Sequence, residues 1–168
     1  MQRRTLLTLG AASAALLLVA GGAAALLRPG FENGALTAPA REVFEAVGSA
    51  VLDKTLPAEA GAKAVAVQGL LGRINVLVQA LPPHAQAELS QLLALLASGA
   101  GRRTLAGLNL PWADASVADV QRALQEMRLS GFALRQQAYA ALHDITAGAY
   151  FSDDASWPML GYPGPMKI

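Results

Sequence analysis

Apolar residues recur at helical spacing in five stretches of the chain between residues 41 and 150. Within each stretch they return every three or four positions, which places them on one side of an α-helix and predicts a buried face. The stretches are residues 41–54, 58–80, 84–98, 116–129 and 132–150. No segment alternates polar and apolar residues for long enough to predict a sheet. The pattern therefore predicts an all-α protein.

Local signals indicate where the helices begin and divide. Pro39 falls in the first turn of the first helix, where a missing N–H costs nothing. Ser116 followed by Asp119 is typical of a helix start whose first turn is capped by side chains. Ser130-Gly131 bends the last helical stretch or divides it in two. We expect an irregular bundle of four to five helices over residues 37–151.

Glycines interrupt the apolar pattern in two places. Gly69 and Gly72 lie inside the second helical stretch, where each costs about 1 kcal/mol relative to alanine. Their spacing predicts either a close helix crossing or a break. Gly99-Ala100-Gly101 ends the third helix, and residues 102–108 predict a short helical turn.

The C-terminal segment, residues 152–168, has a different character. Its three prolines and two glycines are incompatible with a regular helix. It is nevertheless too apolar for a solvated, disordered tail. We therefore expect an extended segment that either packs on its own bundle or docks on another protein. The side chains expected to make that contact are Trp157, Pro158, Leu160, Tyr162 and Pro163.

The N-terminal stretch, residues 1–27, has the pattern of an export leader. Arg3 and Arg4 are adjacent near the start, and residues 5–27 carry no charge. A basic start, an apolar middle and small residues near the end are typical of a secretory leader. The arginine pair favours the twin-arginine type, which engages the twin-arginine translocase.

The fate of this leader has two readings. Ala23 and Ala25 form a small-x-small cleavage site, and we favour cleavage there. Alternatively, about 20 apolar residues suffice to span a bilayer, and the segment would then remain as a membrane anchor. Both readings predict a periplasmic or periplasm-facing protein, with residues 28–36 as a linker to the bundle.

Composition narrows the possible chemistry. The 168-residue chain has no cysteine, which excludes thiolate zinc sites, iron–sulfur ligation and thiol redox chemistry. The formal charge is +1, from 13 basic and 12 acidic residues. Without Arg3 and Arg4 the 13 basic residues become 11, and the charge becomes −1. No basic face predicts a nucleic-acid partner.

The titratable residues predict no active site. His143 and Asp144 are a tempting pair, but adjacent positions on a helix point about 100° apart, so we expect them not to act together. His84 is expected at a helix start, exposed. Asp153-Asp154 is expected to form a turn or a cap, because two carboxylates make a poor cation cage. An enzyme would have to rely on His143, Asp144 and Asp153.

Two further features are candidates for partner contacts. Arg102-Arg103 is expected to be a solvated pair, with contact to a partner as the alternative. Trp112 follows a proline in an irregular stretch, where a tryptophan is either part of the core or an interface anchor. We include Trp112 as a second contact beside the C-terminal segment.

Together these features resemble a known family. The chain looks like a member of the gluconate 2-dehydrogenase subunit 3 group, because it combines a leader with about 140 helical residues and two closing motifs. The closing motifs are Tyr150-Phe151-Ser152-Asp153 and Trp157-Pro158-Met159-Leu160-Gly161-Tyr162-Pro163-Gly164-Pro165. These are small subunits of bacterial flavin-dependent sugar and alcohol dehydrogenases. The resemblance is strongest in the C-terminal segment. No motif here indicates which dehydrogenase would be served, so gluconate itself is not inferred.

The resemblance implies a non-catalytic accessory subunit. In that family a glucose–methanol–choline type large subunit carries FAD and oxidises the substrate, and a cytochrome c subunit often receives the electrons. The small subunit holds no cofactor of its own, and its leader carries a folded, leaderless large subunit across the membrane. The alternative is a free-standing periplasmic helical module that binds a ligand or serves a structural role.

Overall fold

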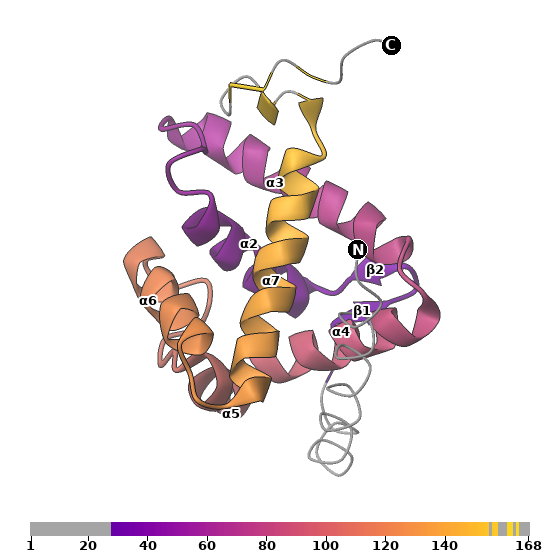
Figure 1. Cartoon of the computed structure of the whole chain (residues 1–168), viewed down its shortest axis with the longest axis vertical. Helices are drawn as coiled ribbons and strands as arrows, with labels where there is room; N and C mark the ends of the chain where they lie inside the picture. The colour runs from indigo at the N-terminus through magenta and orange to yellow at the C-terminus, as the bar shows by residue number, and fades with distance from the viewer. Residues whose placement is uncertain (1–27, 155, 158–160, 163, 165–168) are drawn as a thin grey trace.

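The computed structural model describes residues 28–154, 156–157, 161–162 and 164, and these residues are mostly helical (Figure 1). The elements are β1 (Phe31–Glu32), β2 (Ala35–Leu36), α2 (Ala38–Val51), α3 (Ala60–Gln79), α4 (Pro83–Ala97), α5 (Gly99–Gly101), the π-helical turn η2 (Arg102–Ala106), α6 (Val117–Arg128) and α7 (Ala133–Phe151). The prediction of an irregular all-α bundle is confirmed. The expected leader and its Arg3, Arg4, Ala23 and Ala25 lie outside the described residues. None of the helices in the described ranges combines the length and apolarity that crossing a bilayer requires.

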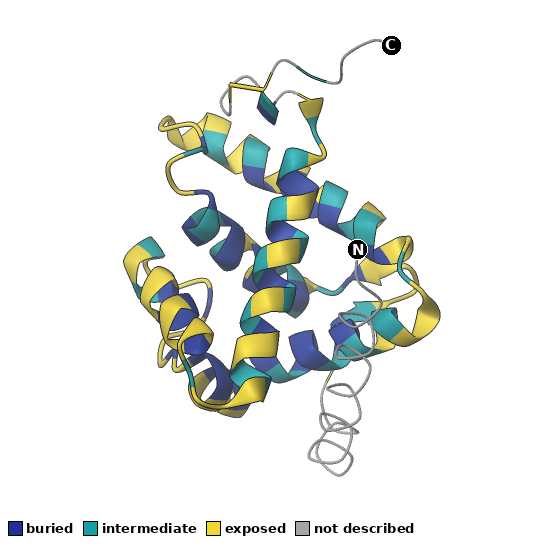
Figure 2. Ribbon diagram, in the orientation of Figure 1, coloured by how far each residue is buried: buried dark blue, intermediate teal, exposed yellow. Residues whose placement is uncertain are grey.

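Helix α2 occupies the centre of the bundle. It contacts α3, α4, α6 and α7, and its buried residues lie on about half of its circumference. The buried faces of the other helices turn toward it (Figure 2), while Glu42 and Glu45 on its opposite side are exposed. The largest fully buried side chains are Phe44, Leu70, Leu71, Ile74, Leu93, Leu96, Met127, Leu142, Val43, Val47, Val78 and Val120.

Side-chain and backbone caps set the helix ends. Ser116 accepts a hydrogen bond from the backbone N–H of Asp119 at 3.2 Å, as the sequence predicts for the start of α6. Glu59 accepts from the N–H groups of Gly61 and Ala62 at the start of α3, at 2.8 and 2.6 Å. The last helical stretch divides around Ser130, so α6 and α7 are separate helices that pack on each other.

The stretch expected as a linker is an ordered hairpin. Strands β1 and β2 pair antiparallel, with Phe31 opposite Leu36. Asn33 and Gly34 form the turn with positive φ angles of 51° and 77°, the conformation that two-residue hairpins favour. Ser90 of α4 accepts from the Phe31 N–H at 3.0 Å and donates to the Phe31 carbonyl at 3.2 Å. Residues 30–36 are therefore part of the folded domain.

The glycines of α3 do not mark a crossing or a break. Helix α3 runs unbroken through Gly69 and Gly72, and a Cβ added at Gly72 would meet no atom within 4 Å. The close helix approach occurs instead at Gly48 of α2, where an added Cβ would lie 2.7 Å from Cδ2 of Leu70. The expected crossing was wrong because both α3 glycines face solvent.

The third helix also ends differently from the prediction. Helix α4 ends at Ala97, and Ser98 then caps a new helical turn by accepting from the N–H of Gly101 at 3.0 Å. That turn continues into η2, which Gly107 terminates with φ of 71°. The helical turn expected around residues 102–108 is thus present, and Gly99–Gly101 begins it rather than ending α4.

Candidate partner-docking site

The C-terminal segment leaves the bundle from a helix end that tertiary contacts hold on two sides. The Tyr150 hydroxyl donates to the carbonyl of Thr55, in the connection between α2 and α3, at 3.1 Å. Arg73 of α3 donates from Nε to the carbonyl of Ala149 at 2.9 Å. The point from which the segment departs is therefore fixed relative to α3.

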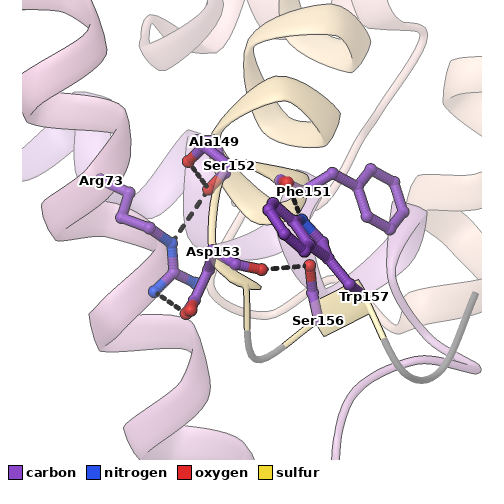
Figure 3. A network of polar contacts seen from close by, with 7 residues as sticks. All are labelled: Arg73, Ala149, Phe151, Ser152, Asp153, Ser156 and Trp157. Atoms are coloured by element: carbon purple, nitrogen blue, oxygen red, sulfur yellow. Dashed lines mark hydrogen bonds and ion pairs between the residues drawn. The ribbon is translucent and has the colours of Figure 1, made fainter. Parts of the chain in front are cut away.

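The first residues of the segment form a tight polar network (Figure 3). Arg73 Nη1 lies 2.9 Å from Oδ2 of Asp153, and the two side chains are 31% and 37% exposed. The Asp153 carbonyl accepts from both the backbone N–H and the hydroxyl of Ser156, at 2.9 and 2.6 Å. Ser156 is buried. The expectation of a turn at Asp153 is met, and its carboxylate also forms an ion pair that the sequence analysis did not foresee.

Trp157 is the centre of a small aromatic cluster. Its indole Nε1 donates to the carbonyl of Phe151 at 3.0 Å. The ring of Tyr162 packs edge-on against it, with centroids 5.3 Å apart, and the Tyr162 N–H donates to the Trp157 carbonyl at 3.2 Å. Gly164 approaches the indole so closely that an added Cβ would lie 3.4 Å from it. These contacts hold Trp157, Tyr162 and Gly164 close together beside the end of α7.

This cluster remains accessible from outside. Trp157 is half-buried and Tyr162 is 47% exposed. Gly161 and Gly164 have φ of 67° and 96°, angles that favour glycine. The described part of the segment thus presents an accessible pair of aromatic rings. Pro158, Leu160 and Pro163, which we also expect to contact a partner, lie outside the described residues.

Trp112 has a different position from the one expected for a partner contact. It is 4% exposed and belongs to the hydrophobic core, and its Nε1 donates to the carbonyl of Leu96 at 2.8 Å. A side chain in this environment stabilises the connection between η2 and α6 rather than offering a surface. We therefore do not count Trp112 among the residues that would contact a partner.

His143 and Asp144 do contact each other, contrary to the expectation from helix geometry. His143 Nδ1 lies 3.0 Å from Oδ1 of Asp144, because the side chains reach around the helix. The imidazole also stacks on Tyr139, one turn earlier, at 5.4 Å. Both partners are solvent-facing, with side-chain exposures of 40% and 76%. The arrangement satisfies His143 locally, as the sequence predicts.

Arg102 is not the solvated residue that the sequence analysis expects. It is 9% exposed, and its guanidinium donates to the carbonyls of Leu108 and Asn109 at 3.3 and 3.4 Å. The irregular stretch after η2 is held by these bonds, since its backbone carbonyls lack helical partners. Arg103 is exposed, as expected. The pair therefore divides between a structural and a surface position.

The described surface has further features outside this site. A hollow of about 300 Å³ lies between α2, the start of α3 and the start of α6, with Glu42, Glu45 and Lys63 at its walls. His84 is exposed at the start of α4. Within the described ranges, no group of three His, Cys, Asp or Glu side chains is placed to hold a metal ion.

Arg73 is the residue of this site that sequence reasoning missed. A signal was available, because Arg73 is the single charged residue between Lys63 and Glu88. A lone charge in a long uncharged stretch either faces solvent or has a specific partner. Arg73 has a specific partner, Asp153, but the two residues are 80 positions apart, so the local sequence does not reveal the pair.

A scan against protein-family models and searches of curated proteins and of solved structures found no match to this chain. The resemblance to dehydrogenase small subunits therefore stays a hypothesis. The fold defines the class of protein as an all-α bundle with an aromatic C-terminal segment. This segment is the feature of the described chain that is best suited to bind a partner.

Proposed function

We propose that this chain is the non-catalytic small subunit of a flavin-dependent sugar or alcohol dehydrogenase. It escorts the FAD-containing large subunit through the twin-arginine translocase and then stabilises it in the periplasm, or anchors it there if the leader is retained. A cytochrome c subunit would complete such a complex. Its own residues bind the partner, and the redox chemistry belongs to the FAD of that partner.

The observation that carries this proposal is the aromatic surface of the C-terminal segment. Trp157 and Tyr162 pack on each other while Tyr162 stays 47% exposed. Tyrosine and tryptophan are enriched at the energetic centres of protein interfaces, because they bury large areas and still offer a hydrogen-bonding group. The hydrogen bonds from Ser156 to Asp153 and from Trp157 to Phe151 already restrain these residues, which reduces the entropy lost on binding.

The leader pattern supports the same proposal. Twin-arginine leaders are associated with export of folded cargo, and a chain with no cysteine and no recognisable catalytic motif gives little reason of its own to cross in that state. A cofactor-loaded partner supplies that reason. The leader and the docking segment then lie at opposite ends of one adaptor chain.

The alternative function is a free-standing periplasmic helical module. The observation that favours it is that the segment makes its described contacts within its own chain, from Arg73 to Asp153 and from Trp157 to Phe151. A segment that is satisfied in this way does not require a partner. The two functions differ in the mass of the native protein and in whether it carries flavin.

Truncation of the segment tests the proposal. A chain ending at Phe151 loses the whole segment, and a chain ending at Asp154 keeps the ion pair to Arg73 but loses the aromatic cluster. We expect both to fold and neither to support export of the flavoprotein. Periplasmic flavin and large-subunit antigen are measured beside circular dichroism of the purified small subunit.

The full-length variant W157A/Y162A is the matched control for chain length. It should lose co-export as the truncations do, because it removes the two aromatic rings and leaves Arg73 and Asp153 in place. Normal co-export by this variant and by both truncations would contradict the proposal. A native protein that purifies as a colourless monomer would support the free-standing module instead.

A further inference from the structure

One guanidinium lies at the boundary between the bundle and the C-terminal segment. Arg73 belongs to α3, is partly buried and reaches both sides of that boundary. We propose that Arg73 is the positioning residue of the C-terminal segment, and this inference rests on the proposed function in so far as the segment docks a partner. Its role is to fix the direction in which the segment leaves α7.

The first contact of Arg73 is with the end of α7. Its Nε donates to the carbonyl of Ala149, which also accepts from the hydroxyl of Ser152 at 2.9 Å. The last carbonyls of a helix have no intrahelical partner and carry the negative end of the helix dipole. A cation supplied from another helix is therefore favourable there, and it ties the last turn of α7 to α3.

The second contact is with the first turn of the segment. Nη1 of the same guanidinium lies 2.9 Å from Oδ2 of Asp153. Because the guanidinium is planar and its N–H groups have fixed directions, two bonds from one group define an orientation as well as a distance. The compact ammonium of a lysine cannot reproduce both contacts in this geometry.

From Asp153 the constraint continues to the aromatic cluster. The Asp153 carbonyl holds Ser156, and the next residue, Trp157, bonds back to the carbonyl of Phe151 (Figure 3). Tyr162 then packs on Trp157. The exposed tyrosine is thus connected to α3 by a short series of hydrogen bonds, and loosening Arg73 loosens the surface that the partner would meet.

The two tryptophans of the chain allow a direct test. The indole N–H of Trp157 reports on the segment, and that of Trp112, bonded to the carbonyl of Leu96 in the core, reports on the bundle. In the full chain carrying R73A, we expect the Trp157 indole N–H to exchange with solvent roughly tenfold faster, the scale of losing a hydrogen bond to a charged group. The Trp112 indole should be unchanged. Equal acceleration of both, or of neither, would overturn the proposal.

Further variants separate the charge from its geometry. R73K keeps the charge but not both contacts. The exchange rate of the Trp157 indole N–H with solvent should therefore still rise, but less than in R73A. R73A and D153N break the same ion pair, so their effects should be less than additive. Full additivity, or complete rescue by lysine, would contradict the orientation argument. R122A, which removes an exposed intrahelical pair with Asp119 on α6, is the matched control and should change neither indole.

Co-export of the flavoprotein completes the experiment. If R73A raises the exchange rate of the Trp157 indole N–H and lowers co-export, both the positioning role and the docking function are supported. If R73A raises this exchange rate while co-export stays normal, Arg73 still positions the segment, but the docking function is wrong. If co-export falls without any change at Trp157, the positioning role is wrong and the docking function stands.

Discussion

The two tryptophans donate their indole N–H groups to backbone carbonyls in different environments. The bond from Trp112 to Leu96 is buried in the core, and the bond from Trp157 to Phe151 lies at the edge of the molecule. Both satisfy a polar atom whose burial would otherwise cost free energy. Their consequences differ, because Trp112 is only 4% exposed, whereas Tyr162 beside Trp157 is 47% exposed.

Glu59 illustrates how a single exposed carboxylate contributes to a helix. Its two oxygens accept from Ala62 and Gly61, and these bonds, Ala62 first, hold the pKa of Glu59 below its ordinary value of 4.5. A carboxyl whose pKa is lowered on folding stabilises the folded state above its unfolded pKa. That contribution is lost as the pH falls below 4.5 and through the lowered folded value.

The prediction is that E59A lowers the free energy of unfolding most at neutral pH. The difference in free energy of unfolding between the wild type and the variant should become smaller as the pH falls below 4.5, because the protonated carboxyl caps the helix less well. Urea unfolding at a series of pH values measures this difference. Glu45 is exposed on α2 and its carboxylate accepts no hydrogen bond from the described residues, so E45A is the control. A gap that stays constant to about pH 3 would show that charge plays no part.

The helices themselves follow from local rules. Pro39 and Ser116 mark the starts of α2 and α6, and the apolar spacing places the buried residues of α6 on one face. The hairpin also had a local signal, since Asn33-Gly34 is the dipeptide that two-residue turns prefer. It was missed because strands of two residues are too short to show alternation.

Glycine substitutions in α2 and α3 should have opposite effects. G72A should raise the free energy of unfolding by about 1 kcal/mol, because Gly72 is an exposed position inside a helix with open space around it. G48A adds a methyl group 2.7 Å from Leu70, which is fully buried. Overpacking costs about 1–3 kcal/mol and should outweigh the gain in helix propensity. Urea unfolding of both variants tests this, and stabilisation by G48A would contradict the close approach of α2 and α3.

The assembled bundle brings together residues that are far apart in the chain. Tyr150 reaches Thr55, and Arg73 reaches Asp153, so the last helix is tied to the connection before α3 and to α3 itself. Gln121 of α6 donates to the carbonyl of Ala50 at the end of α2 at 3.0 Å. The Gln121 bond joins α6 to the central helix, and the other two hold the C-terminal end of α7 and Asp153 against α3 and the connection that precedes it.

The export prediction concerns the whole molecule. R3K/R4K keeps the charge of the N-terminal stretch but removes the paired arginines that the translocase recognises. We expect it to block export of this chain and of the flavoprotein proposed as its partner, while circular dichroism of the chain stays unchanged. R103K/R122K, at two exposed arginines of the bundle, controls for arginine replacement elsewhere and should leave export intact. Export of R3K/R4K at the normal level would contradict the prediction that residues 1–27 are a twin-arginine leader.

Local sequence was sufficient to determine the fold class of this protein and most of its helices. Helical periodicity, caps and breakers act over a few residues, so they can be read without knowing what lies elsewhere. The same reading distinguishes the uncharged N-terminal stretch and the proline- and glycine-rich C-terminal segment from the helical residues between them. It could not decide whether Trp112 is core or surface, because that depends on the position of Leu96 on another element.

Only the tertiary structure decided how the C-terminal segment is held. Arg73 and Asp153 are 80 positions apart, and nothing near either residue indicates the other. The ion pair exists because α3 and α7 pack side by side, which follows from burying their apolar faces around α2. Hydrophobic packing is non-directional, so it brings such polar groups together without any local sequence signal.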